Sequence, residues 1–251
     1  MASQTFRRYS ATMTWTEPFA YFNGLDMAAL ALLFGSWAIS GFAIDHAPKG
    51  RPSVSRLMAQ YLREWMVVMI TRDPRIFDAH ILGTLRQGTS FFASATLIAI
   101  GGSLALLGDL DRVIGIAGDL TPGQEPIVVW ELKILVILLF LANAFLKFVW
   151  SNRLFGYCAV VMAAVPNDAS DPRAIVRARK AGEINITAAR GFNRGLRSLY
   201  FALATAAWLL GSEALLVATA VTVLLLLRRE FASQSRAVLM QPDDATTHTQ
   251  T

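Results

Sequence analysis

Four long blocks of apolar residues constrain the fold of this chain more than any other feature. They cover residues 25–44, 90–107, 127–150 and 199–227, and the charged residues inside them are Asp26, Glu131, Lys133, Lys147 and Glu213. Because an α-helix rises about 1.5 Å per residue, blocks of this length match a hydrocarbon core about 30 Å thick. The blocks predict an all-α, multi-pass membrane protein with four transmembrane helices in a domain covering 25–230.

The composition agrees with this fold class, because 54% of the residues are hydrophobic and only 16% are charged. Soluble domains usually carry more charge. A signal peptide is the rival interpretation of the first block, since Arg7 and Arg8 precede it. The apolar run is too long for a signal peptide, and no clear small-residue cleavage site follows it. We therefore expect a membrane anchor at 25–44, behind an extramembrane segment at 1–24.

The basic residues are concentrated in two of the three connections between the blocks. The first connection holds Lys49, Arg51, Arg56, Arg63, Arg72, Arg75 and Arg86, and the third holds Arg153, Arg173, Arg177, Arg179, Lys180, Arg190, Arg194 and Arg197. The second holds Arg112 with Asp109, Asp111, Asp119 and Glu125. Because cytoplasmic loops are enriched in lysine and arginine, we expect the basic connections inside and both termini on the periplasmic side of a bacterial inner membrane. Four basic residues near the termini do not fit this orientation: Arg7, Arg8, Arg228 and Arg229.

The first connection is expected to contain an amphipathic cytoplasmic helix. Between residues 56 and 71 one face is formed by Leu57, Tyr61, Trp65 and Met69, at the spacing of a helix with one apolar side. Pro74 ends or kinks this helix. Residues 75–87 are expected to form a second, short helix that leads into the second block.

The third connection is also expected to be helical. It opens with Asp171 and Pro172, a pair typical of a helix start. The apolar stripe that follows consists of Ile175, Ala178, Gly182, Ile186, Ala189, Phe192 and Leu196. Such a stripe packs on another helix of the protein or lies on an anionic leaflet. After the fourth block, residues 231–251 are polar, and we expect a disordered tail.

Ionisable residues inside the blocks are the first candidates for function, because charges are costly in a bilayer. Glu213 lies in the middle of the fourth block. Lys133, Lys147 and Asn143 lie near one face of the third block, since residues fourteen apart on a helix are about 40° apart around its axis. We expect Glu213 to be buried and paired with Lys133, or second with Lys147. A structural ion pair, a proton-relay or permeation role, and a snorkelling lysine all remain open.

Small residues mark a second set of candidates in the second block. Ser90, Ser94, Ser103, Gly101 and Gly102 are spaced so that a neighbouring helix can approach closely or so that hydroxyls can line a pore. Asp26, at the start of the first block, is expected to be solvated.

No enzymatic motif is present, and we expect no catalytic residue and no enzyme. The phosphate-binding loop, nucleophile elbow, metalloprotease helix and dinucleotide fingerprint are all missing from the sequence. Cys158 is the sole cysteine, and the histidines lack ligand spacing. We therefore expect no metal and no cofactor. The net charge of +5 is explained by the basic connections, so no nucleic-acid partner is expected.

A set of residues in the first half resembles a known family. It consists of Arg63, Trp65, Met66, Met69, Arg72, Arg75, Asp78, the run Ser90 to Ser94, Gly101, Gly102, Leu106, Leu107 and Gly108, followed by Lys133, Phe145, Lys147, Phe148, Trp150, Ser151, Arg153 and Pro166. This set is similar to an uncharacterised family of membrane proteins of bacteria and plants, domain of unknown function 599. The resemblance covers about residues 25–227. It implies a four-span membrane protein and no particular activity.

Two functional hypotheses follow. The first is a homo-oligomeric ion channel or small transporter, indicated by the polar face of the third block and the basic cytoplasmic surface. The second is an accessory or assembly subunit of a larger membrane complex, indicated by the small-residue face. In both, the expected partners are the lipid bilayer and other protein chains.

Overall fold

The computed structural model describes residues 22–48, 50–111, 114–115 and 126–243. Its helices are α1 (Gly24–Asp45), α2 (Val54–Val68), the 3₁₀ turn η3 (Met69–Thr71), α3 (Ile76–Gly108), α5 (Ile127–Ala163), α6 (Pro172–Ala206), the 3₁₀ turn η4 (Ala207–Leu210), α7 (Ser212–Phe231) and α8 (Gln234–Leu239). The described residues contain no strand. The all-α prediction is therefore confirmed.

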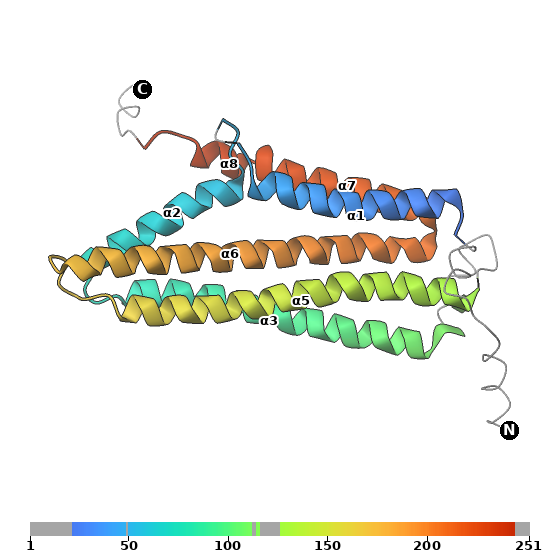
Figure 1. Cartoon of the computed structure of the whole chain (residues 1–251), viewed down its shortest axis with the longest axis horizontal. Helices are drawn as coiled ribbons and strands as arrows, with labels where there is room; N and C mark the ends of the chain where they lie inside the picture. The colour runs from blue at the N-terminus through green and yellow to red at the C-terminus, as the bar shows by residue number, and fades with distance from the viewer. Residues whose placement is uncertain (1–21, 49, 112–113, 116–125, 244–251) are drawn as a thin grey trace, which may run out of the picture.

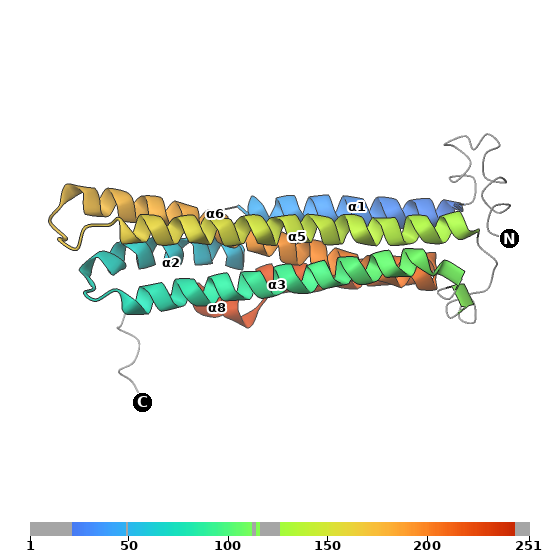
Figure 2. The same ribbon diagram turned by 90° about the horizontal axis from the view of Figure 1, so that it is seen from below.

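The helices form an elongated bundle, and its two halves contain different sets of helices (Figures 1 and 2). Helices α3, α5 and α6 run along both halves. Helices α1 and α7 lie beside the C-terminal half of α6, whereas α2 lies beside its N-terminal half. We call the half with α1 and α7 the apolar half and the half with α2 the basic half, which also contains the helix starts of α3 and α6.

Each half has its own buried core. In the basic half, Met66 and Met69 pack against the C-terminal part of α5 and the alanines of α6. In the apolar half, Leu33, Phe140, Phe201 and related side chains of α1, α5, α6 and α7 form a second cluster. In the basic half, burying each such side chain away from water contributes roughly 1.5–3 kcal/mol. The most extensive contacts between helices are those of α5 with α6 and of α3 with α5. The shorter helices pack against these long ones.

Helices α5 and α6 approach closely at two glycines of α6. A Cβ added to Gly195 would lie 2.7 Å from Cε1 of Phe148, whereas a Cβ added to Gly191 would lie 3.5 Å from Cβ of Ser151. Phe148 is fully buried and stacks against Phe92 of α3. The ring therefore has little room to move away from a larger residue at 195.

Gly195→Ala is expected to destabilise the protein by about 1–2 kcal/mol. The overpacking against Phe148 costs about 1–3 kcal/mol, and the better helix propensity of alanine offsets up to about 1 kcal/mol of it. Gly191→Ala is the matched control, because its Cβ fits and only the propensity gain remains. Unfolding in mixed micelles measures both, and equal stabilities of the two variants would contradict the close approach.

The predicted fourth transmembrane helix at 199–227 is wrong as a single helix. The block is interrupted by η4 and by Gly211, whose φ of 119° is positive, and α7 then turns back along α6. Glycine adopts such a φ without the steric cost that a Cβ brings. Gly211 is followed by the polar residues Ser212 and Glu213, but long apolar stretches resume on both sides, so the mean hydropathy of the block stays high across the turn.

Other predicted boundaries change in the same direction, toward longer helices. Residues 75–87 are not a separate helix but the first part of α3, and α5 continues past residue 150 to Ala163. The predicted tail begins with the short helix α8. The remainder of that tail, 244–251, and most of the segment 1–24 lie outside the described residues, as do Arg112, Asp119 and Glu125 of the second connection.

The start predicted for the helix at Asp171 and Pro172 agrees with the structure. Asp171 caps α6 by accepting a hydrogen bond from the backbone N–H of Arg173, with Pro172 at the first position. Hydrogen bonds from the side chain and backbone of Arg173 lower the pKa of Asp171 to about 2. The apolar stripe of α6 packs inside the protein. Leu57 of α2 and Met69 of η3 are buried as expected, but Tyr61 of α2 is exposed and Met66 is buried instead.

The described ends of the chain lie at opposite ends of the apolar half. Helices α1 and α7 are parallel: Asp26 near the start of α1 accepts a hydrogen bond from Ser212 at the start of α7, and Glu230 at the end of α7 binds Ser55, just after α1. If α7 crosses a membrane together with α1, the two termini are on opposite sides. The prediction of both termini on the same side does not fit this arrangement.

Candidate functional site

A basic cleft lies where the apolar and basic halves meet, between the end of α1, α2, α5 and α6. It consists of two adjoining hollows of about 470 and 380 Å³ that share Asp45 and His46. Its basic side chains are Arg56, Arg63, Lys147, Arg190, Arg194 and Arg197. Asp45 is the acidic residue in its lining among the described residues, so the cleft carries an excess of positive charge.

The end of α1 and the start of α2 are fixed by a set of hydrogen bonds that shapes this cleft. Ser53 caps α2 by accepting from the N–H of Arg56, and its hydroxyl donates to the carbonyl of Ile44 at 3.1 Å. Ser55 donates to the buried carboxylate of Glu230 through both its N–H and its hydroxyl, each at 3.1 Å. Arg56 also donates to the carbonyl of Ala47. The turn between α1 and α2 is thereby tied to the end of α7.

Asp45 and two arginines of α6 form the charged centre of the cleft. Nε of Arg194 lies 2.9 Å and Nη2 of Arg197 lies 3.1 Å from the carboxylate of Asp45. The side chain of Arg197 is only 8% exposed. Such a buried guanidinium requires a counter-charge, because an unpaired buried ion costs several kcal/mol. The pair therefore fixes α1 against α6 at the level of the cleft.

The remaining positive charges of the cleft differ in how they are neutralised. Arg63 pairs with Glu183 at 2.6 Å on the exposed side of α2 and α6, and the hydrogen bond from Arg63 lowers the pKa of Glu183. Lys147 and Arg190 form no salt bridge with any residue in the described part of the chain. The charge of Lys147 is available to an anion from solution, whereas the charge of Arg190 also acts on Glu183, whose pKa it helps to lower.

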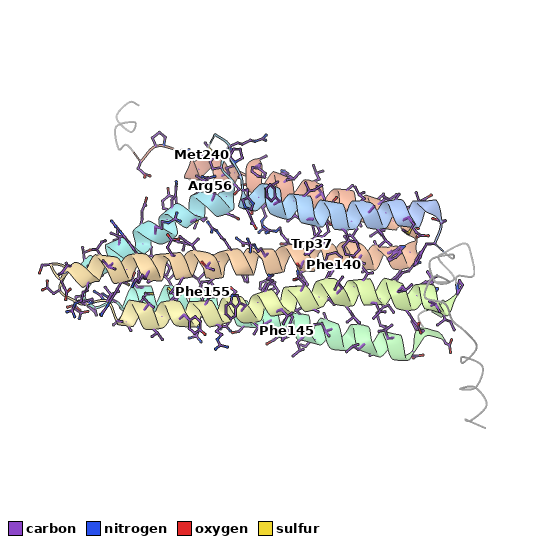
Figure 3. All side chains as sticks on the ribbon, in the orientation of Figure 1. Trp37, Arg56, Phe140, Phe145, Phe155 and Met240 are labelled. Atoms are coloured by element: carbon purple, nitrogen blue, oxygen red, sulfur yellow. The ribbon has the colours of Figure 1, made fainter. Side chains whose placement is uncertain are left out.

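An aromatic layer closes the cleft toward the apolar half. Trp37 lines the cleft and packs edge-on against Phe140 at 5.6 Å, and Phe140 stacks with Phe34 and Phe201. Figure 3 marks Trp37 and Phe140 next to each other, at the level where α1, α5 and α6 run side by side. Just on the cleft side, Nδ2 of Asn143 donates to Oγ of Ser198 at 2.6 Å. The polar lining therefore changes to an aromatic one within a short distance.

A second buried polar cluster lies beyond the aromatic layer, at the far end of the apolar half. Asp26 is 6% exposed and accepts hydrogen bonds from Trp208, at 3.0 Å, and from Ser212. Lys133 is 2% exposed, with Nζ 4.9 Å from the ring centre of Trp130 and 5.7 Å from that of Trp208. The expectation of a solvated Asp26 is therefore wrong. The turn at Gly211 brings the two hydrogen-bond donors, Trp208 and Ser212, close to Asp26.

The predicted burial of Glu213 is also wrong. Glu213 lies in the first turn of α7 and is exposed, because the fourth block turns at Gly211 and places residue 213 at the end of the bundle. An acidic side chain in a first turn is stabilised by the positive end of the helix dipole. Asn143 and Lys147 do share a site, the basic cleft, while Lys133 belongs to the cluster at the other end of the same helix.

Gly101 and Gly102 of α3 do not pack against another helix among the described residues. A Cβ added to Gly101 or Gly102 would meet no atom within 4 Å, and both glycines are exposed. Ser94 is exposed, Ser103 donates to the carbonyl of Ala99, and Ser90 accepts from Asn152 of α5. This part of α3 contacts α5 on one side and leaves its small-residue face open.

Sequence reasoning missed the central residues of the cleft. Asp45 ends the first apolar block, and Arg194 and Arg197 precede the last one. In the sequence, Arg194 and Arg197 enter only as charges that orient the chain and Asp45 does not enter at all, although charged residues directly beside apolar blocks on different helices are candidates for pairing at one depth. Partners from separate helices cannot be matched without knowing which helices are neighbours.

In the part of the chain that the structure describes, three helices, α1, α3 and α5, are long and apolar enough to cross a membrane. Together with the exposed apolar side chains along them, this indicates a helical membrane protein. The family described as "Protein of unknown function, DUF599" matches residues 28–235. The chain belongs to that family, as the residues noted above indicate. No curated protein and no solved structure matches it.

Proposed function

We propose that the protein crosses the membrane five times, with α1, α3, α5, the end of α6, and α7. The fifth crossing is supported by the turn at Gly211, because the uncharged stretches 198–210 and 214–227 lie on antiparallel helices. Leu203 and Val217 on these stretches are 66% and 64% exposed, as expected for lipid-facing residues. The basic half is then cytoplasmic, and Arg228 and Arg229 follow the positive-inside rule.

Cysteine labelling is expected to place the start and the end of α7 on opposite sides. In a Cys158→Ser background, Glu213→Cys should react with an impermeant thiol reagent in intact cells. Ser235→Cys in α8 should react only after the membrane is opened, because it follows the basic end of α7. Labelling of Ser235→Cys in intact cells would contradict the five-crossing topology and restore a periplasmic C-terminus.

We infer further that the protein is a small transporter or channel for anions, with the path inside one chain. The observation that carries this proposal is the basic cleft, where Lys147 and Arg190 add positive charge beyond the Asp45 pairs. Three features follow one another along α1, α5 and α6. They are the basic cleft, the aromatic layer at Phe140, and the cluster of Lys133 and Asp26. A cationic mouth raises the local concentration of anions, and an apolar constriction closes a path to hydrated ions.

Flux of a small inorganic anion such as chloride or phosphate into proteoliposomes tests this function. Lys147→Gln is expected to reduce the flux several-fold at low salt and less at high salt, because screening weakens the attraction. Lys180→Gln is the control, since that lysine is exposed on α6 and does not line the cleft. Absence of anion flux in the parent protein, or equal losses in both variants, would contradict the proposal.

A second candidate function is an accessory or assembly subunit, favoured by the open small-residue face of α3. Gly101 and Gly102 would let a helix of another chain approach closely. A second copy would give the homo-oligomer expected from the sequence, and an unrelated helix would give a larger complex. The mass of the particle in mild detergent distinguishes the two.

A further inference from the structure

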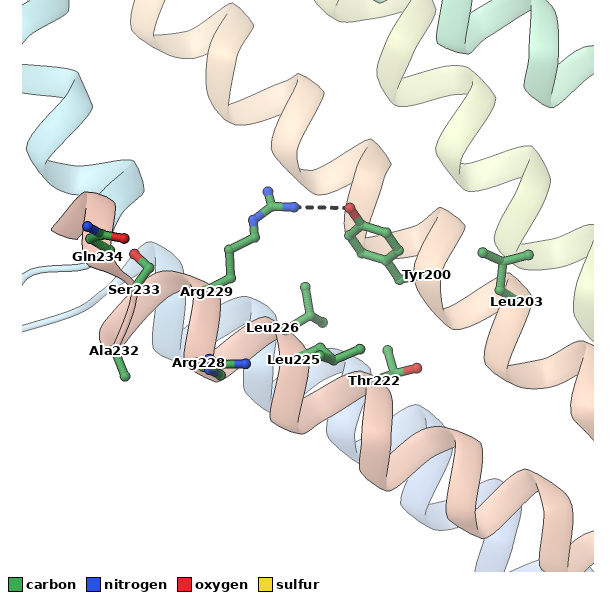
Figure 4. A pocket seen from close by; sticks show the side chains of 10 residues that line it. All are labelled: Tyr200, Leu203, Thr222, Leu225, Leu226, Arg228, Arg229, Ala232, Ser233 and Gln234. Atoms are coloured by element: carbon green, nitrogen blue, oxygen red, sulfur yellow. Dashed lines mark hydrogen bonds between the residues drawn. The ribbon is translucent and has the colours of Figure 1, made fainter.

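A groove of about 550 Å³ between α6 and α7 has an apolar side and a basic end. Its apolar wall includes Leu203 of α6 and Leu225 of α7, and its basic end is formed by Arg228 and Arg229. Figure 4 shows Arg229 extending from α7 toward α6, where its guanidinium donates to the hydroxyl of Tyr200 at 3.0 Å. The groove opens on the outside of the bundle, since Leu203 and Leu225 are 66% and 57% exposed.

The basic end of the groove lies at the level where the apolar half ends. Glu230, the residue after the two arginines, accepts a hydrogen bond from Ser55 at the start of α2. The polar residues Ser233 and Gln234 continue the lining of the groove. The apolar wall reaches back to Thr222, which lies about 10 Å from Arg229 along α7 at about 1.5 Å per residue. One groove thus combines two arginines at the end of the apolar half with an apolar wall that runs along that half.

We propose that this groove binds one anionic phospholipid, with its phosphate at Arg228 and Arg229 and an acyl chain along Leu203 and Leu225. Charge and polarity along the groove select this occupant. A free anion would use only the basic end, and a zwitterionic lipid would bring its own cation beside the arginines. The site is separate from the basic cleft, and its test does not depend on anion flux.

Lipid retention by the purified full-length protein tests the proposal. Protein in mild detergent is mixed with phosphatidylglycerol, with phosphatidylcholine of the same acyl chains, or with inorganic phosphate, and bound lipid and melting temperature are measured. Phosphatidylglycerol is expected to be retained and to raise the melting temperature. Loss of two lipid-facing charges in Arg228→Gln/Arg229→Gln is expected to weaken its binding about tenfold or more.

Two further variants separate the groove from general charge effects. Arg153→Gln removes a matched arginine, since Arg153 donates to Tyr157 at 2.6 Å on α5 but lines no part of the groove, and it should bind phosphatidylglycerol normally. Leu203→Trp fills the apolar channel and should reduce lipid retention while leaving both arginines. Equal retention of phosphatidylcholine, equal loss in Arg153→Gln, or stabilisation by phosphate alone overturns the lipid site.

Discussion

Asp45→Asn is expected to destabilise the protein by about 3 kcal/mol. The substitution removes the counter-charge of Arg194 and of Arg197, whose side chain is 8% exposed. Breaking a buried pair by removing one partner costs about 3–5 kcal/mol, because the remaining charge is left unpaired. The lower end applies here, since Arg194 is about half exposed and the asparagine still accepts one hydrogen bond.

The double variant Asp45→Asn/Arg197→Met should recover part of this loss. Methionine fills a similar volume without charge, so the double variant leaves no buried ion. Glu183→Gln is the control for a surface pair: Arg63 and Glu183 are 48% and 59% exposed, and exposed pairs contribute roughly 0–1 kcal/mol. Equal losses for Asp45→Asn and Glu183→Gln in unfolding experiments would show that the Asp45 pair is not shielded from water.

The positions of the first three apolar blocks agree with helices of the structure. A helix that crosses a membrane needs a long apolar run, and such a run is visible in the sequence. Residues 25–44 coincide with α1, and the second and third blocks lie inside α3 and α5. The start of α6 at Asp171 and Pro172 was predictable for a local reason, since the cap and the fixed φ of proline act within one turn.

The fourth block shows what hydropathy does not contain. A helix that crosses the membrane and one that turns back within the same apolar stretch have similar mean hydropathy, and here the turn lies at the short polar run of Gly211, Ser212 and Glu213. Gly211 is the one residue of this block that adopts a positive φ without strain, but glycines also occur inside membrane helices, as Gly101 does in α3. The turn changes the location of Glu213, and in the proposed topology it also adds a crossing, so both differences from the prediction have one cause.

The candidate site was predicted in part. Asn143 and Lys147 lie at the cleft because they are on one face of one helix, which a helical period gives directly. Asp45, Arg194 and Arg197 are on other helices, and their meeting depends on the packing of α1 against α6. Asp26 was read as solvated because its hydrogen-bond donors, Trp208 and Ser212, are far away in sequence and reach it only through the turn.

Trp65→Ala is expected to destabilise the protein by about 3 kcal/mol. The ring of Trp65 packs against the buried cluster of the basic half, and its Nε1 donates to Oδ1 of Asp78 at 2.6 Å. Truncation of a buried tryptophan costs about 3–5 kcal/mol. Trp65 is half-buried, which favours the lower end. The loss also removes a hydrogen bond from Asp78, which is fully buried and whose Oδ2 has no protein partner among the described residues.

Trp65→Phe separates the hydrogen bond from the packing of the ring. Phenylalanine retains most of the apolar contact but cannot donate to Asp78, which then keeps the bond from Arg72 at 2.5 Å. A hydrogen bond to a charged group contributes about 1.5–3 kcal/mol, so this variant should lose roughly half of what Trp65→Ala loses. An unchanged melting temperature in detergent for Trp65→Ala would mean that the ring faces lipid, because detergent replaces lipid contacts but not a protein core. If Trp65→Phe instead loses as much as Trp65→Ala, the link between α2 and the start of α3 depends on the Asp78 carboxylate rather than on ring packing.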